Sequence, residues 1–384
     1  MSSVSDSYKN SANTPSKQTL TKYIAMALLA LLSFGLTGLG AIVVMFALST
    51  LRAGRDSAAS HGISSRNSSR LGGVAIVITF MLFLIGMVLL SSYTPGVVRD
   101  VTFLHVWSTV FVCVILGGAE DIKADLLSPY FRLVVKLLAF GFFLWTTPNV
   151  VPLVIGIPGI DYLLSVPLVA WGLCTIFCVG FINAFNMADG ANGLIPGIAT
   201  IAFGILFLVY GRPAEGVLFF VCLMFLIFNV VSGWFFLGDM GSYGLGAVLV
   251  CYGLLGVAQG DFSAGFMASL LSYPCVDFLV SVIRRLRKGL SPLQADNGHL
   301  HNRLYSFYAP KFKSRVTPNS LTGLTISSGS SGVSLIIYVF DWIAIDSNTW
   351  FGIFGIQVVV YLIILSRLRR TQMNQSELII GMSS

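Results

Sequence analysis

The chain has 384 residues, of which 55% are hydrophobic and 10% are charged, and its formal net charge is +7. Soluble proteins carry about 25% charged residues, so this composition excludes a chain of several water-facing domains. It indicates an all-α integral membrane protein, a polytopic bundle. The basic excess fits Lys and Arg in cytoplasmic loops, so no nucleic-acid partner is expected.

A membrane-spanning helix needs about 20 mostly apolar residues, and the chain holds eleven such runs, or ten without the weakest. Their approximate limits are 24–48, 72–93, 101–119, 131–148, 164–184, 193–211, 214–236, 242–259, 264–283, 324–343 and 349–366. The run 324–343 is the weakest, because serine and glycine dilute its start. The segment 149–163 is interpreted as a short extracytoplasmic hairpin or a re-entrant piece.

The charged residues indicate the domain organisation and the orientation. A polar tail covers 1–22, a single membrane domain covers 23–370, and a short tail covers 371–384. Of the 23 basic residues, 18 fall on one side of the predicted spans, and the positive-inside rule makes that side the cytoplasm. We therefore expect a multi-pass protein of the plasma (inner) membrane with a cytoplasmic C-terminus, although three lysines of the N-terminal tail oppose this orientation.

Only sixteen residues are acidic, and several lie at the predicted cytoplasmic ends of apolar helices, beside glycines. These are Glu120, Asp121, Asp189 and Asp239. Acids placed next to membrane helices are costly and usually face a cavity. Hard cations such as Mg²⁺ prefer oxygen ligands, so the three acidic loops predict a shared cation site. For any single one of these acids, a solvated loop charge or a helix cap is the alternative.

The longest loop, about 284–320, is strongly basic and holds two of the four histidines. His299, His301 and Arg303 follow one another at every second position. The H-x-H spacing lacks the second ligand pair of a zinc site, so phosphate recognition by His and Arg is one interpretation, and a plain positive-inside loop is the other. Asp277 is an intramembrane acid and therefore a functional candidate. The chain has neither G-x-x-x-x-G-K-[ST] nor G-x-G-x-x-G.

Five segments together resemble the polyprenyl-phosphate N-acetylhexosamine-1-phosphate transferases, which place phospho-N-acetylglucosamine or phospho-muramoyl-pentapeptide on a lipid phosphate. They are His61 with RLGG (70–73), GGAEDIKADLLSPYFRLVVK (117–136), NAFNMADGANGL (183–194), FLGDMGSYGLG (236–246) and SPLQADNGHLHNRL (291–304). Each motif alone is moderately specific. Their shared order and their shared side of the membrane make the resemblance strong.

The resemblance implies a Mg²⁺-dependent glycosyl-1-phosphate transferase, with Mn²⁺ as the alternative ion. A UDP-N-acetylhexosamine, N-acetylglucosamine by default, would donate its sugar-1-phosphate to undecaprenyl phosphate at a cytoplasmic site, and UMP would leave. The product would start the synthesis of a cell-envelope polysaccharide or O-antigen. Membrane lipids, and a second copy in a homodimer, are the further partners expected.

The resemblance also assigns roles to residues. It implies Asp239 and Asp121 as Mg²⁺ ligands, with Asp121 also the candidate base. The catalytic set is Asp121, Glu120, Asp189 and Asp239. The residues implied in substrate binding are Lys136, Asn186, Asn192, His299, His301, Arg303, His61 and Arg70.

Three positions depart from the family pattern and place the chain in a divergent branch. Glu120 stands where better-known members carry Asp, Asn192 where many carry a second Asp, and Asn302 where many carry a further His. These changes leave the sugar open, and they motivate one alternative, a catalytically inactive relative that acts as a scaffold. The other alternative is a secondary transporter that uses intramembrane acids such as Asp277.

Overall fold

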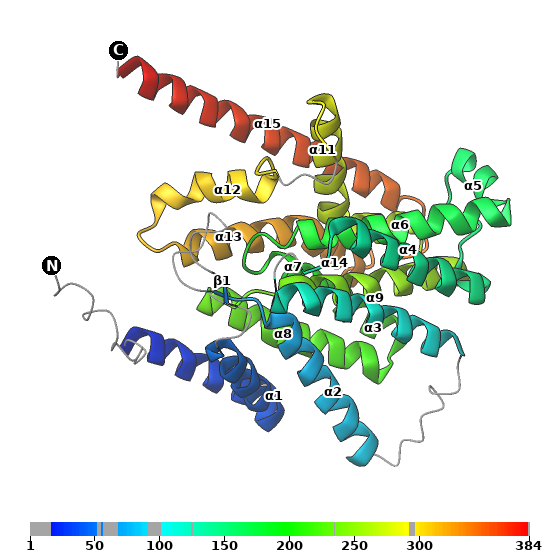
Figure 1. The fold of residues 1–384 in the computed structure, drawn as a ribbon, viewed down its shortest axis with the longest axis horizontal. Helices are drawn as coiled ribbons and strands as arrows, with labels where there is room; N and C mark the ends of the chain where they lie inside the picture. The colour runs from blue at the N-terminus through cyan, green and yellow to red at the C-terminus, as the bar shows by residue number, and fades with distance from the viewer. Residues whose placement is uncertain are drawn as a thin grey trace.

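The computed structural model describes residues 17–51, 55–56, 68–90, 101–123, 126–233, 235–291 and 296–382. Most of these residues are helical, which confirms the all-α class (Figure 1). The long helices are α1 (Lys17–Thr50), α2 (Gly72–Leu90), α3 (Val101–Ile122), α4 (Pro129–Thr146), α6 (Pro167–Met187), α7 (Leu194–Tyr210), α8 (Pro213–Ser232), α9 (Gly238–Gln259), α11 (Ser272–Arg287) and α15 (Trp350–Met382).

Shorter elements connect them. The short α-helices are α5 (Pro158–Leu164), α10 (Ala264–Leu270), α12 (Leu300–Tyr308), α13 (Val316–Ser327) and α14 (Val333–Val339). The remaining turns are η2 (Pro148–Val150), η3 (Ala309–Lys311) and the π-helical η4 (Ser328–Gly332). Two antiparallel two-residue strands, β1 (Arg55–Asp56) and β2 (Ser68–Ser69), lie between α1 and α2. The segment 149–163 lies between α4 and α6 and contains most of η2 and α5.

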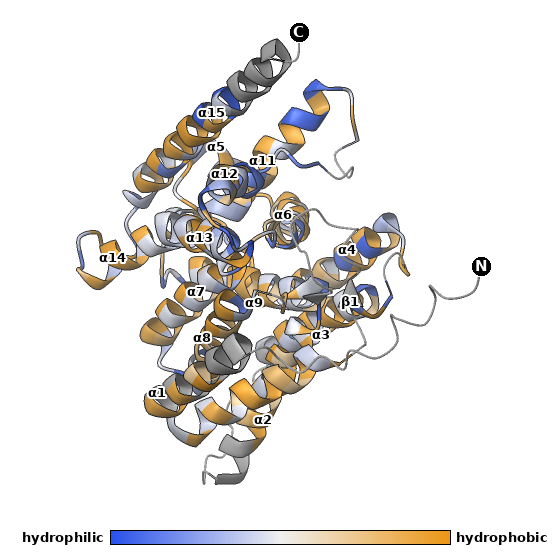
Figure 2. Ribbon diagram, turned by 90° about the vertical axis from the view of Figure 1, so that its left-hand side faces the viewer, coloured by the Kyte–Doolittle hydropathy of each residue, from blue (hydrophilic) through white to orange (hydrophobic). Residues whose placement is uncertain are grey.

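Seven helices of the described chain are long and apolar enough to cross a membrane, or eight when the bent pair α10–α11 counts as one span. Three further predicted spans fall on α1, α2 and α7, whose described apolar parts are shorter. Helix α1 is interrupted at Gly35, where φ is +63°. Apolar residues dominate α1, α2, α7 and α8, whereas hydrophilic residues gather on α11 and α12 (Figure 2). The protein is thus a multi-pass membrane protein.

Helix α9 lies at the centre, with 83% of its most apolar window buried, and α2, α3 and α6 pack around it. Glycines allow the backbones of α2 and α3 to contact the backbone of the first turn of α9. A Cβ added to Gly117 of α3 would lie 2.3 Å from the carbonyl oxygen of Asp239, and one added to Gly73 would lie 2.2 Å from the Gly241 nitrogen. This close approach brings the acidic end of α3 to the aspartate at the start of α9.

The loop before α2 is tied to the loop before α9 by backbone hydrogen bonds. Gly72 N donates to the Phe236 carbonyl at 2.9 Å, Gly73 N donates to Leu237 at 2.7 Å, and Phe236 N donates to Ser69 at 2.8 Å. The R-L-G-G and F-L-G-D segments therefore lie side by side.

The predicted span 264–283 is wrong as a single helix, because it forms α10 and α11 with a bend of 79° between them. Pro274 lies in the first turn of α11, and a proline can neither donate to the carbonyl four residues earlier nor avoid clashing with it. That carbonyl belongs to Leu270, and it accepts a hydrogen bond from Ser331 Oγ at 2.6 Å. A side chain of another helix thus satisfies the group that the break leaves open.

The predicted span 324–343 also needs correction, since the continuous helical segment is Val316–Val339. The serine and glycine run lies in its middle, as the π-helical turn η4, and does not delay its start. Hydroxyl groups there find local partners: Ser330 Oγ donates to the Ile326 carbonyl at 2.7 Å. These bonds make the polar run compatible with a membrane helix.

The Ser331→Ala substitution tests this account of the break. It removes the donor of the buried Leu270 carbonyl, and an unsatisfied buried group costs about 1–3 kcal/mol. We expect a clear fall in the thermal unfolding midpoint of the detergent-solubilised protein. The matched control is Ser328→Ala, because Ser328 lies in the same turn and is exposed. Equal effects of the two substitutions would contradict the account.

Candidate active site

Asp121, at the end of α3, holds the first turn of α9. Its Oδ1 accepts the Asp239 N–H at 2.9 Å, and its Oδ2 accepts the Met240 N–H at 2.8 Å. These N–H groups have no partner inside the helix, and a carboxylate at a helix N-terminus is electrostatically favourable. The contacts make Asp121 a helix-capping group, while its predicted part in metal binding remains a prediction.

Asp239 keeps a partly open carboxylate, with a side chain 29% exposed. Its Oδ1 accepts a hydrogen bond from Asn186 Nδ2 at 2.9 Å, and Asn186 Nδ2 also donates to Ser242 Oγ at 2.8 Å. Its Oδ2 lies 3.4 Å from Arg132 Nη1. Asp239 thus keeps an exposed edge while its orientation is set by neighbours on α4, α6 and α9.

Glu120 occupies the predicted position beside Asp121 and is buried. Its Oε1 accepts the Leu127 N–H at 2.7 Å, and its Oε2 lies 3.4 Å from Arg132 Nη1. Arg132 therefore bridges Glu120 and Asp239. The longer Glu side chain, where better-known members carry Asp, is fully engaged in ordering the α3–α4 turn.

Sequence reasoning missed four residues of this cluster: Arg132, Asn183, Ser242 and Tyr243. Lys136, one turn after Arg132 on α4, is only 1% exposed. Its Nζ donates to Asn183 Oδ1 and lies 4.2 Å from the Tyr243 ring centroid. The spacing of Arg132 and Lys136 was the available sequence signal, since side chains three or four residues apart share a helix face.

Asp189 lies in the short loop between α6 and α7. Removal of its carboxyl from water raises its pKa to about 8, and repulsion from Asp239 and then Asp121 adds to the effect. Three carboxylates therefore share one region of negative potential, where a divalent cation would relieve the repulsion. In the described part of the chain no group of three or more His, Cys, Asp and Glu is arranged to hold a metal, but Mg²⁺ usually takes one or two carboxylates together with waters and phosphates.

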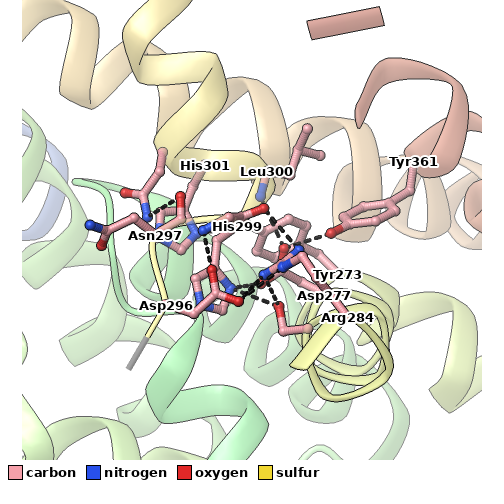
Figure 3. Close-up of polar contacts among 12 residues, drawn as sticks. Tyr273, Asp277, Arg284, Asp296, Asn297, His299, Leu300, His301 and Tyr361 are labelled. Carbon is pink, nitrogen blue, oxygen red and sulfur yellow. Dashed lines mark hydrogen bonds and ion pairs between the residues drawn. The ribbon is translucent and has the colours of Figure 1, made fainter. Parts of the chain in front are cut away.

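The predicted histidines lie in a second polar cluster, with Asp277, Tyr273 and Arg284 (Figure 3). His299 Nδ1 pairs with the buried carboxylate of Asp277, and His301 Nδ1 lies 2.9 Å from the Tyr273 hydroxyl. The two imidazole rings stack, with centroids 5.2 Å apart and planes 10° from parallel. Asp277 also accepts bonds from Leu300 N and Tyr361, so the acid that suggested a transporter is fully paired.

The segment that carries the histidines contacts the α6–α7 loop, which carries Asp189, at Gly190. A Cβ added there would lie 2.2 Å from His301 Nε2, so only a glycine allows the ring to come so close to the residue after Asp189. The candidate site is therefore one continuous region with carboxylates on one side and imidazoles on the other.

Several arginines lie near the histidines. Arg284 orders the loop before them by pairing with Asp296 at 2.7 Å and donating to the Gly298 carbonyl at 3.0 Å. Burial, and then the guanidinium groups of Arg369 and Arg284, lower the pKa of Arg303. Guanidinium groups gathered from α11, α12 and α15 favour an anion with several oxygens.

Asn192, Arg70 and His61 were also predicted to bind substrate, and the structure describes each to a different extent. Asn192 is 1% exposed; its N–H donates to Asn319 Oδ1 at 3.1 Å and its Oδ1 accepts from Asn229 at 3.4 Å. These contacts brace the start of α7, and substrate binding by Asn192 remains a prediction. The Arg70 carbonyl lies against Gly238. His61 lies outside the described residues.

Comparison with known proteins agrees with the resemblance in the sequence. The glycosyl transferase family 4 model matches residues 103–257. The chain is 30% identical over 211 residues to phospho-N-acetylmuramoyl-pentapeptide-transferase of Deinococcus radiodurans, covering 50% of this chain and 63% of the relative. It is 33% identical over 127 residues to undecaprenyl-phosphate alpha-N-acetylglucosaminyl 1-phosphate transferase of Thermotoga maritima, covering 33% and 40%.

A third relative matches a longer stretch. The chain is 28% identical over 269 residues to decaprenyl-phosphate N-acetylglucosaminephosphotransferase of Mycobacterium tuberculosis, covering 61% of this chain and 65% of the relative. The chain thus spans less than two thirds of each of these three relatives.

Gly238→Ala tests the packing around Asp121. Gly238 has φ of +73°, and an added Cβ would lie 2.3 Å from the Arg70 carbonyl oxygen. Gly260 has φ of +76° with nothing within 4 Å, so Gly260→Ala isolates the backbone strain, about 1–2 kcal/mol. We expect Gly238→Ala to lower the thermal unfolding midpoint considerably more than its control. A loss no larger than that of Gly260→Ala would show that the site tolerates the crowding.

His301 makes stability depend on pH. Burial lowers its pKa to about 4, from an ordinary 6.5, although Asp277 counteracts part of this effect. The folded protein then binds fewer protons than the unfolded chain between these values, so stability is lost as the pH falls from 6.5 to 4, by about 3 kcal/mol at most. We expect the unfolding midpoint of the wild type to fall more steeply over this range than that of His301→Gln. Parallel curves would contradict a neutral His301.

Proposed function

Because residues 103–257 match the glycosyl transferase family 4 model, we propose that the protein is a polyprenyl-phosphate N-acetylhexosamine-1-phosphate transferase. Its donor is a UDP-N-acetylhexosamine, by default N-acetylglucosamine, and its acceptor is undecaprenyl phosphate. The observation that carries the proposal is the contact of His301 with Gly190, which joins the carboxylate loops and the cationic histidine loop in one site.

In this reaction two anionic phosphates must come together. An oxygen of the lipid phosphate forms a bond to the β-phosphorus of the donor, the bond from that phosphorus to the bridging oxygen breaks, and UMP leaves with the electron pair. The chain offers cations on both sides of such a substrate, Arg132 and Lys136 on α4 and Arg303 on α12. Preorganised positive groups of this kind stabilise charge that develops in a transition state.

Asp239, with Asp121 and Asp189 beside it, would hold the Mg²⁺ ion, or Mn²⁺ in its place. Burial raises the pKa of Asp189, and repulsion from Asp239 and Asp121 adds to the effect. This repulsion and the exposed edge of Asp239 support the assignment. When bound, the ion neutralises phosphate charge and helps to align the reacting groups. Asn186 orients Asp239 from α6, and Asp121 orients it through the backbone of α9.

The proposal places the protein in the plasma (inner) membrane, with the site and the C-terminus on the cytoplasmic side, where UDP-sugars are available. Support comes from the distribution of basic residues and from the spans. Its lipid-linked product would begin a cell-envelope polysaccharide such as an O-antigen. A homodimer remains a prediction.

The inactive-scaffold alternative has less support, because the altered residues are engaged. Glu120 pairs with Arg132 and accepts the Leu127 N–H. Asn302 is half-buried on α12, with its amide 3.5 Å from the Asn297 carbonyl. Neither change removes Asp121, Asp189 or Asp239.

The test is a transfer assay with the purified chain in detergent, undecaprenyl phosphate, Mg²⁺ and a panel of UDP-sugars. We expect UMP and a lipid-linked sugar phosphate from at least one N-acetylhexosamine donor. Asp239→Asn should lower kcat about 10²- to 10³-fold, the scale for loss of one group that stabilises a transition state. Asp346→Asn is the control, because Asp346 is exposed outside the site. No product with any sugar would overturn the proposal, and full activity of Asp239→Asn would overturn the assigned centre.

A further inference from the structure

Asp277 is an intramembrane carboxylate that the proposed reaction does not use directly. It lies on α11, is 1% exposed, and is held from three directions (Figure 3). Its Oδ2 pairs with His299 Nδ1, and its Oδ1 accepts the Tyr361 hydroxyl at 2.7 Å and the Leu300 N–H at 3.1 Å. A buried charge without such partners would be strongly unfavourable, so the three donors explain how it persists.

The carboxylate determines which nitrogen of His299 carries a proton. An ionised carboxylate only accepts hydrogen bonds, so the Nδ1 that faces Asp277 must be the donor. The same Nδ1 also lies 3.2 Å from Ser281 Oγ. Nε2 is then the nitrogen left for a ligand, and both ring nitrogens are donors when the imidazole carries two protons. In that form Nε2–H donates to an anion.

His301 differs although it lies two residues away. Its Nδ1 faces a neutral hydroxyl, that of Tyr273, at 2.9 Å, and burial lowers its pKa to about 4. The rings are stacked 5.2 Å apart, where two cations would repel each other. The H-x-H motif thus combines one histidine with a carboxylate partner and one without.

The position of His299 suits phosphate. It is the N-terminal capping residue of the nine-residue helix α12, whose free N–H groups and dipole favour negative charge. Arg303 follows four residues later and therefore lies on the same helix face. His299 Nε2–H and the Arg303 guanidinium can serve the same anion.

We propose that Asp277 and Tyr361 are positioning residues, which hold His299 as a donor directed at the diphosphate of the nucleotide sugar. The proposal rests on the proposed function and deepens it. It also brings α15 into the working site, because Tyr361 lies on that helix, which packs against α10, α11 and α12. The C-terminal helix would then contribute to donor binding and not only to anchoring in the membrane.

The decisive measurement is ¹⁵N NMR of the full chain in detergent with labelled histidine. The chain has four histidines, and His299→Gln assigns the relevant signals. We expect a protonated Nδ1 at His299 in the wild type and a changed Nδ1 signal in Asp277→Asn. Tyr273→Phe is the matched control, and it should shift the His301 signals and leave His299 in place. An unprotonated Nδ1 in the wild type, or identical His299 signals in Asp277→Asn, would overturn the proposal.

Kinetics separate positioning from general damage to the fold. Asp277→Asn should lower kcat/KM for the UDP-sugar about 10- to 100-fold, the scale for loss of a partner that orients a functional histidine, with KM for undecaprenyl phosphate unchanged. Asp277→Glu should recover part of the loss, and the milder Tyr361→Phe should show a smaller loss of the same kind. Equal losses toward both substrates, without recovery in Asp277→Glu, would contradict positioning. Absence of activity in the wild type would instead refute the proposed function, while the NMR result still decides the pairing.

Discussion

The carboxylate of Asp121 accepts the first free N–H groups of α9, and the geometry of the whole site depends on this contact. It holds the end of α3 against the start of α9 and thereby places Asp239 beside Asn186 and Arg132. A buried charged group is costly unless several donors surround it, and Asp121 is buried. The helix N-terminus supplies those donors, so the same contact stabilises the fold and positions the Asp239 carboxylate.

A second constraint is the close approach of backbones at glycine. Gly117 and Gly73 let α3 and α2 contact the first turn of α9, and Gly190 lets the His301 ring reach the loop that carries Asp189. Small residues at these points have a direct functional consequence, because each contact joins two segments that bear polar groups. A membrane protein with few charges can build a polar site in this way, by bringing the ends of its helices together.

Much of this arrangement was predictable, for physical reasons. Acids at the ends of apolar helices are costly, so Asp121, Asp189 and Asp239 stood out in the sequence, and the structure places them near one another. The bridging role of Arg132 was hidden, because a basic residue near the membrane is expected in any cytoplasmic loop. The burial of Asn192 was also hidden, since a neutral amide serves a helix start as well as a ligand. Pro274 carried the signal for the broken helix, but hydropathy alone treats its run as continuous.

The central claim is that the two sides of the site act on one diphosphate, moving a sugar together with its phosphate. Donor labelled with ³²P at the β-position tests this most directly, with wild-type protein and undecaprenyl phosphate. The account predicts that the label moves into the lipid phase with the sugar, while label at the α-position stays in water as UMP. Transfer of the sugar to lipid with the β-label left in the aqueous phase would contradict it.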